Sequence, residues 1–308
     1  MNASNDALPI SCVKCKTIRA FTLVEVLVAS AVVIVLSGMV IHIAGSALNT
    51  YNRSVGKLSA NAEARLALDV IARDLETAVL RNNGQQWLRV EGPTAINTGA
   101  PYDAGSVVLK LFAPTQDGNG DGICAVAYKL EYRESYAGGP NIYALYRKVV
   151  DPQTTLNSYL GSSFDHPANS PQGNIEESNT QADWSMNSIT QNGNFLTSNI
   201  VEFKVLVYDQ TSMPNPVNAN SATNVIIRDY AFGGDANLSS PSDFDEVSRF
   251  PPLYAEVILT VVSDQGMDLL NNIAQGLAPK NTLINAANVV DQHGKTLIRR
   301  VYFKSNPI

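Results

Sequence analysis

The clearest ligand-site pattern in the sequence is an acidic, glycine-rich run that spells D-x-N-x-D-G. Its side-chain oxygens belong to Asp117, Asn119 and Asp121. At this spacing three oxygen ligands can face one side of a tight loop, and hard cations such as Ca²⁺ prefer oxygen. The twelfth position of such a loop is normally a bidentate glutamate, but here it is Tyr128. Two interpretations stay open: a calcium site completed by Glu131 or another acidic loop, or an exposed turn that binds no metal.

Patterns that would indicate catalysis are missing from the sequence. The chain contains no G-x-S-x-G, no H-E-x-x-H and no phosphate-binding glycine loop. Its histidines, His42, His166 and His293, are far apart in the sequence and belong to no motif. We therefore expect a protein that is not an enzyme and that needs no cofactor, with calcium as the one exception left open.

The composition favours an exported, folded chain over a nucleic-acid-binding one. The chain has 308 residues, of which 45% are hydrophobic and 16% charged, and its net charge is −6. That hydrophobic fraction is enough for a core, and the negative balance offers no basic surface to phosphates. The chain has three cysteines, and two of them, Cys12 and Cys15, lie in the first 20 residues. Cys124 is the one cysteine in the rest of the chain, so that part contains no second cysteine for a disulfide, and we expect no disulfide scaffold.

Residues 21–48 form a strongly apolar segment, FTLVEVLVASAVVIVLSGMVIHIAGSAL, whose only formal charge is Glu25. A helix of about 20 apolar residues crosses the hydrocarbon core of a bilayer. Lys14, Lys16 and Arg19 precede the segment, and the positive-inside tendency leaves that end in the cytoplasm. A secretory signal peptide would have a shorter apolar core. A plain anchor explains everything except Glu25, because an unpaired carboxylate in a membrane helix costs about 2–3 kcal/mol.

The run KTIRAFTLVEVLV, from Lys16 to Val28, resembles the N-terminal signature of type IV prepilins and type II secretion pseudopilins. The resemblance implies that a prepilin peptidase cuts between Ala20 and Phe21 and methylates the new amine of Phe21. Glu25 is then the fifth mature residue, which pairs with the amine of a neighbouring subunit during assembly. Members usually have glycine before the cut, and Ala20 departs from that pattern.

Three later runs resemble the larger minor subunits of these systems, the J-type pseudopilins and W-type minor pilins. They are RLALDVIARDLETAV, PPLYAEVILTVVSDQG and RRVYFKSNP. The resemblance implies a structural, minor subunit of a type IV pilus or a type II secretion pseudopilus. Its implied partners are the prepilin peptidase/methyltransferase, other pilin or pseudopilin subunits and an inner-membrane assembly platform. The implied location is the inner membrane, single-pass with a cytoplasmic N-terminus, and later the filament.

We expect four regions along the chain: a leader at 1–20, a transmembrane helix at 21–48, its amphipathic continuation at 49–81, and an extracytoplasmic β-rich head at 84–308. Proline is absent between Phe21 and Arg81, so one helix can run through both middle regions. Two adjoining rows at helical spacing predict its buried face. They are Leu58, Ala62, Leu66 and Val70, and then Leu68, Ile71, Leu75 and Val79.

Seven runs rich in β-branched and aromatic residues predict the strands of the head. They are Trp87–Val90, Ser106–Phe112, Ala125–Tyr132, Ile142–Val150, Ile200–Tyr208, Leu253–Val262 and Ile298–Phe303. The third and fourth runs flank GGPN and predict a hairpin. Regions 151–199 and 210–250 are rich in Asn, Ser, Pro and Gly and predict long loops. The expected fold is α+β and pilin-like, with the long N-terminal helix packed on a mostly antiparallel sheet.

Two other functions fit the sequence. One is a binding module, a pilus-tip adhesin whose loops recognise a surface or polymer. The other is a membrane-anchored extracytoplasmic protein that never polymerises, for which the apolar segment alone would be sufficient. The carboxylate of Glu25 favours assembly over both, because it is costly in a membrane helix unless it has a partner.

Overall fold

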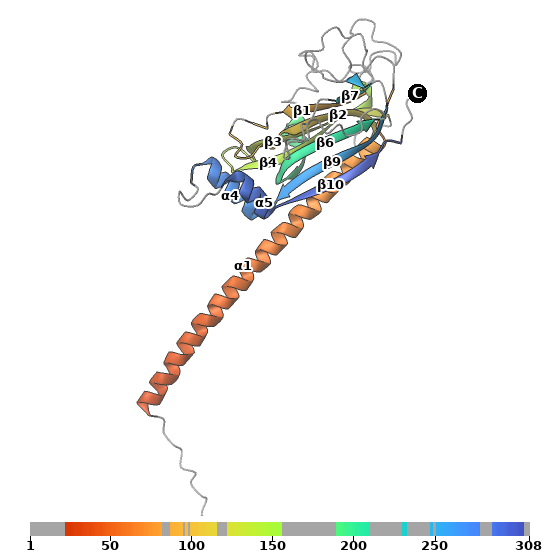
Figure 1. Ribbon diagram of the computed structural model, residues 1–308. Helices are drawn as coiled ribbons and strands as arrows, with labels where there is room; N and C mark the ends of the chain where they lie inside the picture. The colour runs from red at the N-terminus through yellow and green to blue at the C-terminus, as the bar shows by residue number, and fades with distance from the viewer. Residues whose placement is uncertain are drawn as a thin grey trace, which may run out of the picture. The chain divides into compact units, whose positions relative to one another are not determined.

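The computed structural model describes residues 22–81, 87–94, 96–97, 99–115, 122–155, 189–209, 230–232, 247–248, 251–277 and 285–304. Contacts divide the chain into two compact units, Met1–Asn52 and Arg53–Ile308. The expected α+β class is confirmed, because a long apolar N-terminal helix and antiparallel sheets make up the described residues. Figure 1 shows these elements.

Helix α1 is continuous over Leu23–Glu76, 54 residues. It begins where the hydroxyl of Thr22 accepts the N–H of Glu25 at 3.2 Å, an N-terminal cap. The expected helix ran to Arg81, whereas α1 ends five residues earlier. The chain leaves the helix because the N–H of Val79 donates to the carbonyl of Phe112 at 2.7 Å instead of to a helical carbonyl.

The strands of the second unit form two sheets. The larger has the order β5 (Phe195–Ser198), β4 (Asn141–Val150), β3 (Ile123–Glu134), β2 (Ser106–Pro114), β1 (Leu88–Thr94), β7 (Tyr230–Phe232) and β8 (Val247–Ser248). The smaller has the order β10 (Gly294–Tyr302), β9 (Pro252–Val262) and β6 (Ile200–Asp209). Neighbouring strands are antiparallel except β7 and β8, which are parallel.

Each of the seven predicted strands overlaps a strand of the structure, and β3 and β4 form the predicted hairpin, with Leu130 opposite Leu145. The two predicted loops are corrected. The first contains α2 (Pro152–Thr154), η3 (Asn192–Asn194) and β5, and the second contains β7 and β8. These elements are short, and the strands among them depend on partners distant in the sequence, since β5 pairs with β4 and β7 with β1. The remainder of both regions lies outside the described residues.

Two short helices that the sequence did not predict follow strand β9. Helix α4 spans Asp264–Ala274 and is capped by Ser263, and α5 spans Ala286–His293 and is capped by Asn285. The α5 C-terminus lies directly against α4, since a Cβ at Gly266 would come within 2.7 Å of the His293 Cβ. A glycine is therefore required at this contact.

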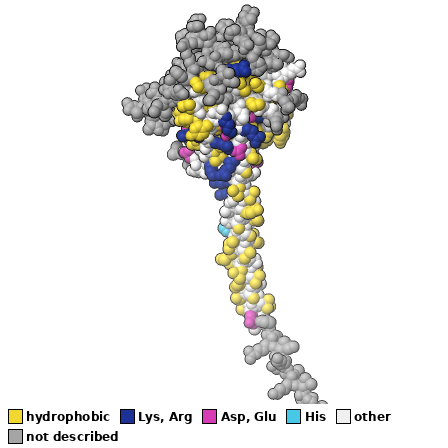
Figure 2. All heavy atoms as spheres, turned by 90° about the vertical axis from the view of Figure 1, so that its right-hand side faces the viewer, with side chains coloured by type: hydrophobic (Ala, Val, Ile, Leu, Met, Phe, Trp, Pro, Cys, Tyr) yellow, Lys and Arg dark blue, Asp and Glu magenta, His cyan; other side chains and the backbone are white. Residues whose placement is uncertain are grey.

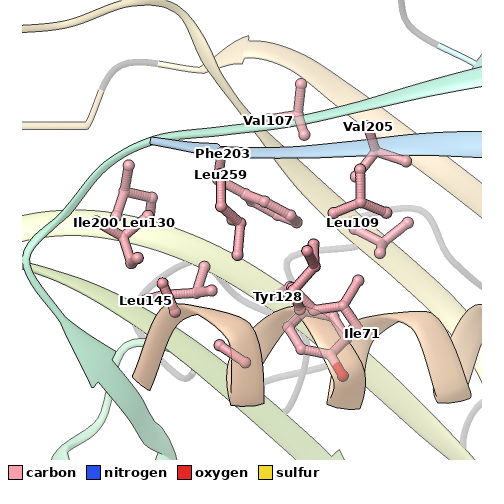
Figure 3. Packing of buried hydrophobic residues seen from close by; sticks show 14 of the residues in the cluster. Ile71, Val107, Leu109, Tyr128, Leu130, Leu145, Ile200, Phe203, Val205 and Leu259 are labelled. Carbon is pink, nitrogen blue, oxygen red and sulfur yellow. The ribbon is translucent and has the colours of Figure 1, made fainter. Parts of the chain in front are cut away.

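The core of the second unit includes one face of α1, but only one of the two predicted rows belongs to it. Leu68, Ile71 and Leu75 are buried, and Figure 3 shows Ile71 beside Tyr128 in this cluster. The other predicted row is wrong: Leu58 and Leu66 are 69% and 66% exposed. Alanines take its place in the core, at Ala60, Ala64 and Ala67. Small side chains let the helix approach the sheets closely, which larger leucines at the same positions would prevent.

Candidate assembly segment

The part of α1 in the first unit carries apolar side chains that pack on nothing in this chain. Leu23 is 80% exposed and Ile34 71%, and every described residue before Asn52 is exposed. Figure 2 shows yellow, hydrophobic side chains along the length of this part of the helix. By length and composition α1 is the one described helix that can cross a membrane, and it lies near the N-terminus. A segment this apolar requires lipid or other helices around it, which is compatible with a membrane anchor.

Glu25 lies in the first turn of α1, three residues after the capping Thr22. A Thr-x-x-Glu sequence at this position is the pattern of a capping box, and a carboxylate there is also stabilised by the helix dipole. Both effects are local and need no second molecule. The side chain of Glu25 is exposed, so its carboxylate is also accessible to a group from outside the chain. Ala20 and Phe21, the predicted cleavage residues, lie outside the described residues.

A strand that begins shortly after the acidic run occupies the residues that would form the second half of the predicted calcium loop. Asp117, Asn119 and Asp121 lie outside the described residues. A twelve-residue calcium loop would extend to Tyr128, but strand β3 already begins at Ile123. Tyr128 is fully buried, and Glu131, the proposed extra donor, lies in the same strand and pairs with Lys129 at 3.8 Å. No group of three metal-ligating side chains occurs among the residues that the structure describes.

A buried polar cluster that the sequence did not predict joins the C-terminal end of α1 to the larger sheet. Asp74 is 3% exposed, and its Oδ2 accepts hydrogen bonds from the Tyr128 hydroxyl and from Nε of Arg147, the latter at 2.9 Å. Nη2 of Arg147 donates to the other oxygen of Asp74 at 3.2 Å. The guanidinium thus binds the carboxylate through both of its oxygens, the strongest geometry for such a pair. Burial, and then the charge of Asp74, raises the pKa of Tyr128 well above its ordinary value.

Of the histidines, only His42 and His293 lie in the described part of the chain. His42 is exposed on α1, in its apolar half. His293 ends α5, and its buried Nδ1 has no hydrogen-bond partner among the described residues. Burial lowers the pKa of His293, and the nearby positive charges of Lys57 and Arg53 lower it further. Both effects favour the uncharged imidazole, and the Cβ of His293 lies beside Gly266 of α4.

The smaller sheet carries a row of three tyrosines on the face away from the core. Tyr208 and Tyr302 are each the register partner of Tyr254, from β6 and β10 respectively. The first pair of rings is stacked with centroids 4.5 Å apart, and the second is tilted at 5.9 Å. Arg300 lies over the Tyr254 ring and also bonds Glu256 at 2.6 Å. Sequence alternation places these side chains on one face, but only the register aligns them.

Comparisons with protein-family models, with curated proteins and with solved structures find no match for this chain. Its function is therefore inferred from the residues themselves.

Proposed function

We propose that the chain is a structural, minor subunit of a type IV pilus or a type II secretion pseudopilus, and not an enzyme. The observation that carries the proposal is the run KTIRAFTLVEVLV, from Lys16 to Val28, whose last six residues open α1. The exposed apolar half of α1 supports it, because that surface has no partner within the chain. The antiparallel sheets on the second half of the same helix also agree with a pilin-like fold.

In this proposal a prepilin peptidase removes residues 1–20 and methylates Phe21. The new N-terminus is a cation close to the membrane boundary, and Glu25 is a carboxylate about one helical turn away. Two unit charges about 4 Å apart attract by about 4 kcal/mol at an effective dielectric of 20, against about 1 kcal/mol in water. The amine of an incoming subunit therefore gains most by meeting the Glu25 carboxylate of a neighbour inside the apolar bundle.

The pairing also sets the axial offset between subunits. Any other offset leaves an amine and a carboxylate unpaired in a low-dielectric environment, which costs more than the pair gains. The remaining partners in the proposal are the other subunits and an inner-membrane assembly platform. The protein is then single-pass in the inner membrane before it enters the filament.

Processing is tested by mass spectrometry of the protein isolated from cells that contain a prepilin peptidase. The expected N-terminus is methylated Phe21. Ala20→Gly restores the usual family residue and should raise the processed fraction, because glycine presents no side chain at the cut. An intact leader in both the wild-type protein and Ala20→Gly would overturn the proposal.

Assembly is tested by the fraction of the protein that enters sheared filaments or pseudopili. Glu25→Gln keeps a side chain that can complete the capping box but removes the charge, so we expect normal membrane insertion and a loss of incorporation. Glu25→Asp keeps the charge and is the matched control. Normal incorporation of Glu25→Gln would show that Glu25 acts only as a helix cap.

A further inference from the structure

Strand β10 forms one edge of the smaller sheet, and its hydrogen-bond register shows which of its residues face outward. Ser263 N–H donates to the His293 carbonyl, and Phe303 N–H donates to the Leu253 carbonyl. In an antiparallel pair, hydrogen-bonded and non-hydrogen-bonded positions alternate. Odd-numbered residues of β10 therefore bond to β9 through the continuous ladder from Gly294 to Tyr302. Even-numbered residues direct their backbone N–H and C=O groups to the open edge.

Four residues offer a free backbone on this edge: Thr296, Ile298, Arg300 and Tyr302. Among the described residues none of their outward N–H or C=O groups has a hydrogen-bond partner. Beyond them, the outward N–H of Lys304 is already used, since it donates to the Glu76 carbonyl at 3.3 Å. The open stretch therefore begins after α5 and ends at the contact with α1, a length that suits one added strand.

The same four residues also carry exposed side chains. Ile298 and Tyr302 are 64% and 60% exposed, and both lie on the face that carries the tyrosine row. The ladder has no bulge and contains no proline, so the edge lacks two of the devices that normally prevent strand addition. A strand placed beside β10 would continue the tyrosine row with its own side chains.

The charge on this edge selects the kind of strand that it can accept. Residues 294–304 contain Lys295, Arg299, Arg300 and Lys304 and no acidic residue, although the whole chain is net −6. Three of these cations are paired with carboxylates on other elements: Arg300 with Glu256 on β9, and Arg299 and Lys304 with Asp69 and Glu76 on α1. Figure 2 shows Lys and Arg side chains gathered on one face of the second unit. Strand β10 itself therefore presents basic side chains and no acidic ones to an approaching strand.

We propose that the open edge of β10 binds an extended, acidic segment of another protein, which adds a fourth strand to the smaller sheet. Backbone hydrogen bonds to Thr296, Ile298, Arg300 and Tyr302 supply the affinity, and acidic side chains opposite the basic ones supply the selectivity. A second copy of β10 is the wrong occupant, because antiparallel self-pairing would bring two basic strands together. This inference is independent of the proposed function in filaments.

The test uses the full chain in detergent and a fluorescent nonapeptide in which glutamate alternates with valine or tyrosine. Anisotropy should show saturable binding that weakens with salt, and hydrogen exchange should show new protection at Thr296 and Ile298. The same peptide with lysine in place of glutamate should not bind. A peptide N-methylated along one edge should also fail, since it cannot donate to β10.

Two variants at one position separate the backbone from the side chain. Ile298→Pro removes an N–H that the β9 ladder does not use, so the sheet should tolerate it while peptide binding is lost. Ile298→Thr keeps the N–H and should bind. Equal binding of the N-methylated or lysine peptide, or no saturable binding at all, would overturn the proposal. Concentration-dependent dimers in light scattering, with β10 protected in the absence of peptide, would overturn the choice of occupant.

Discussion

Removing Arg147 should destabilise the second unit strongly, because Asp74 would be left as a buried, poorly compensated carboxylate. Asp74 is 3% exposed and, among the described side chains, would keep the Tyr128 hydroxyl as its donor. Breaking a buried ion pair from one side costs about 3–5 kcal/mol. For a folded unit of this size, about 2–4 °C of Tm per kcal/mol predicts a Tm drop of about 6–20 °C for Arg147→Ala.

The matched control is Arg299→Ala, which breaks the Asp69–Arg299 pair. That pair also joins α1 to a strand, but its side chains are 59% and 39% exposed, so its loss should cost about 0–1 kcal/mol. Both variants are compared with the wild-type full chain in detergent by thermal unfolding followed by circular dichroism. A Tm drop for Arg147→Ala no larger than that for Arg299→Ala would refute the reasoning.

A third variant tests whether the penalty comes from the unpaired charge rather than from lost contacts. Tyr128→Phe combined with Asp74→Leu and Arg147→Met replaces the whole polar cluster by apolar side chains of comparable length. Such replacements are often neutral or stabilising, so the triple variant should melt closer to the wild type than Arg147→Ala does. If the triple variant is as unstable as Arg147→Ala, the destabilisation of Arg147→Ala comes from lost packing contacts and not from the unpaired charge.

The remaining predictions concern the helix face, His293 at the end of α5, and calcium. Ile71→Ala should cost about 2–5 kcal/mol because the residue is fully buried, whereas Leu66→Ala on the exposed row should stay within about 0.5 kcal/mol in the same denaturation assay. Because the pKa of His293 is lowered in the folded state, its contribution to folding stability is complete above about pH 6.5 and is lost as the pH falls. His293→Gln should therefore reduce the fall in Tm between neutral and mildly acidic buffer. Calcium should leave the Tm unchanged relative to a chelator, because β3 occupies the second half of the predicted loop, and a calcium-dependent rise in Tm would contradict this prediction.

Local pattern was sufficient for α1 and for seven strands, but it missed the short strands β5, β7 and β8. Alternating β-branched and aromatic residues identify strands because the pleat places alternate side chains on opposite faces. The absence of proline from Phe21 to Arg81 allows one long helix. The end of α1 was not predictable in the same way, since it depends on the hydrogen bond from Val79 to Phe112, a residue of another element.

The buried face of α1 is the place where the hydrophobic pattern gave a wrong prediction. Leu58 and Leu66 are more hydrophobic than the alanines, so a count of apolar residues favours the row that is exposed. The structure buries Ala64 and Ala67 because the helix lies too close to the sheets for larger side chains. Hydrophobicity predicted that one face is buried, and the size of the space decided which one.

The sequence by itself determined the features that depend on neighbours in the chain: an apolar helix that begins with Thr22 and Glu25, the seven longer strands, and the basic run before residue 21. Tertiary structure decided everything that joins distant residues. Asp74 meets Arg147 across 73 positions, and the open edge of β10 exists only because the strand order ends there. Hydrogen bonding and charge act over a few ångströms in space, so the fold had to bring these groups together before either feature could be recognised.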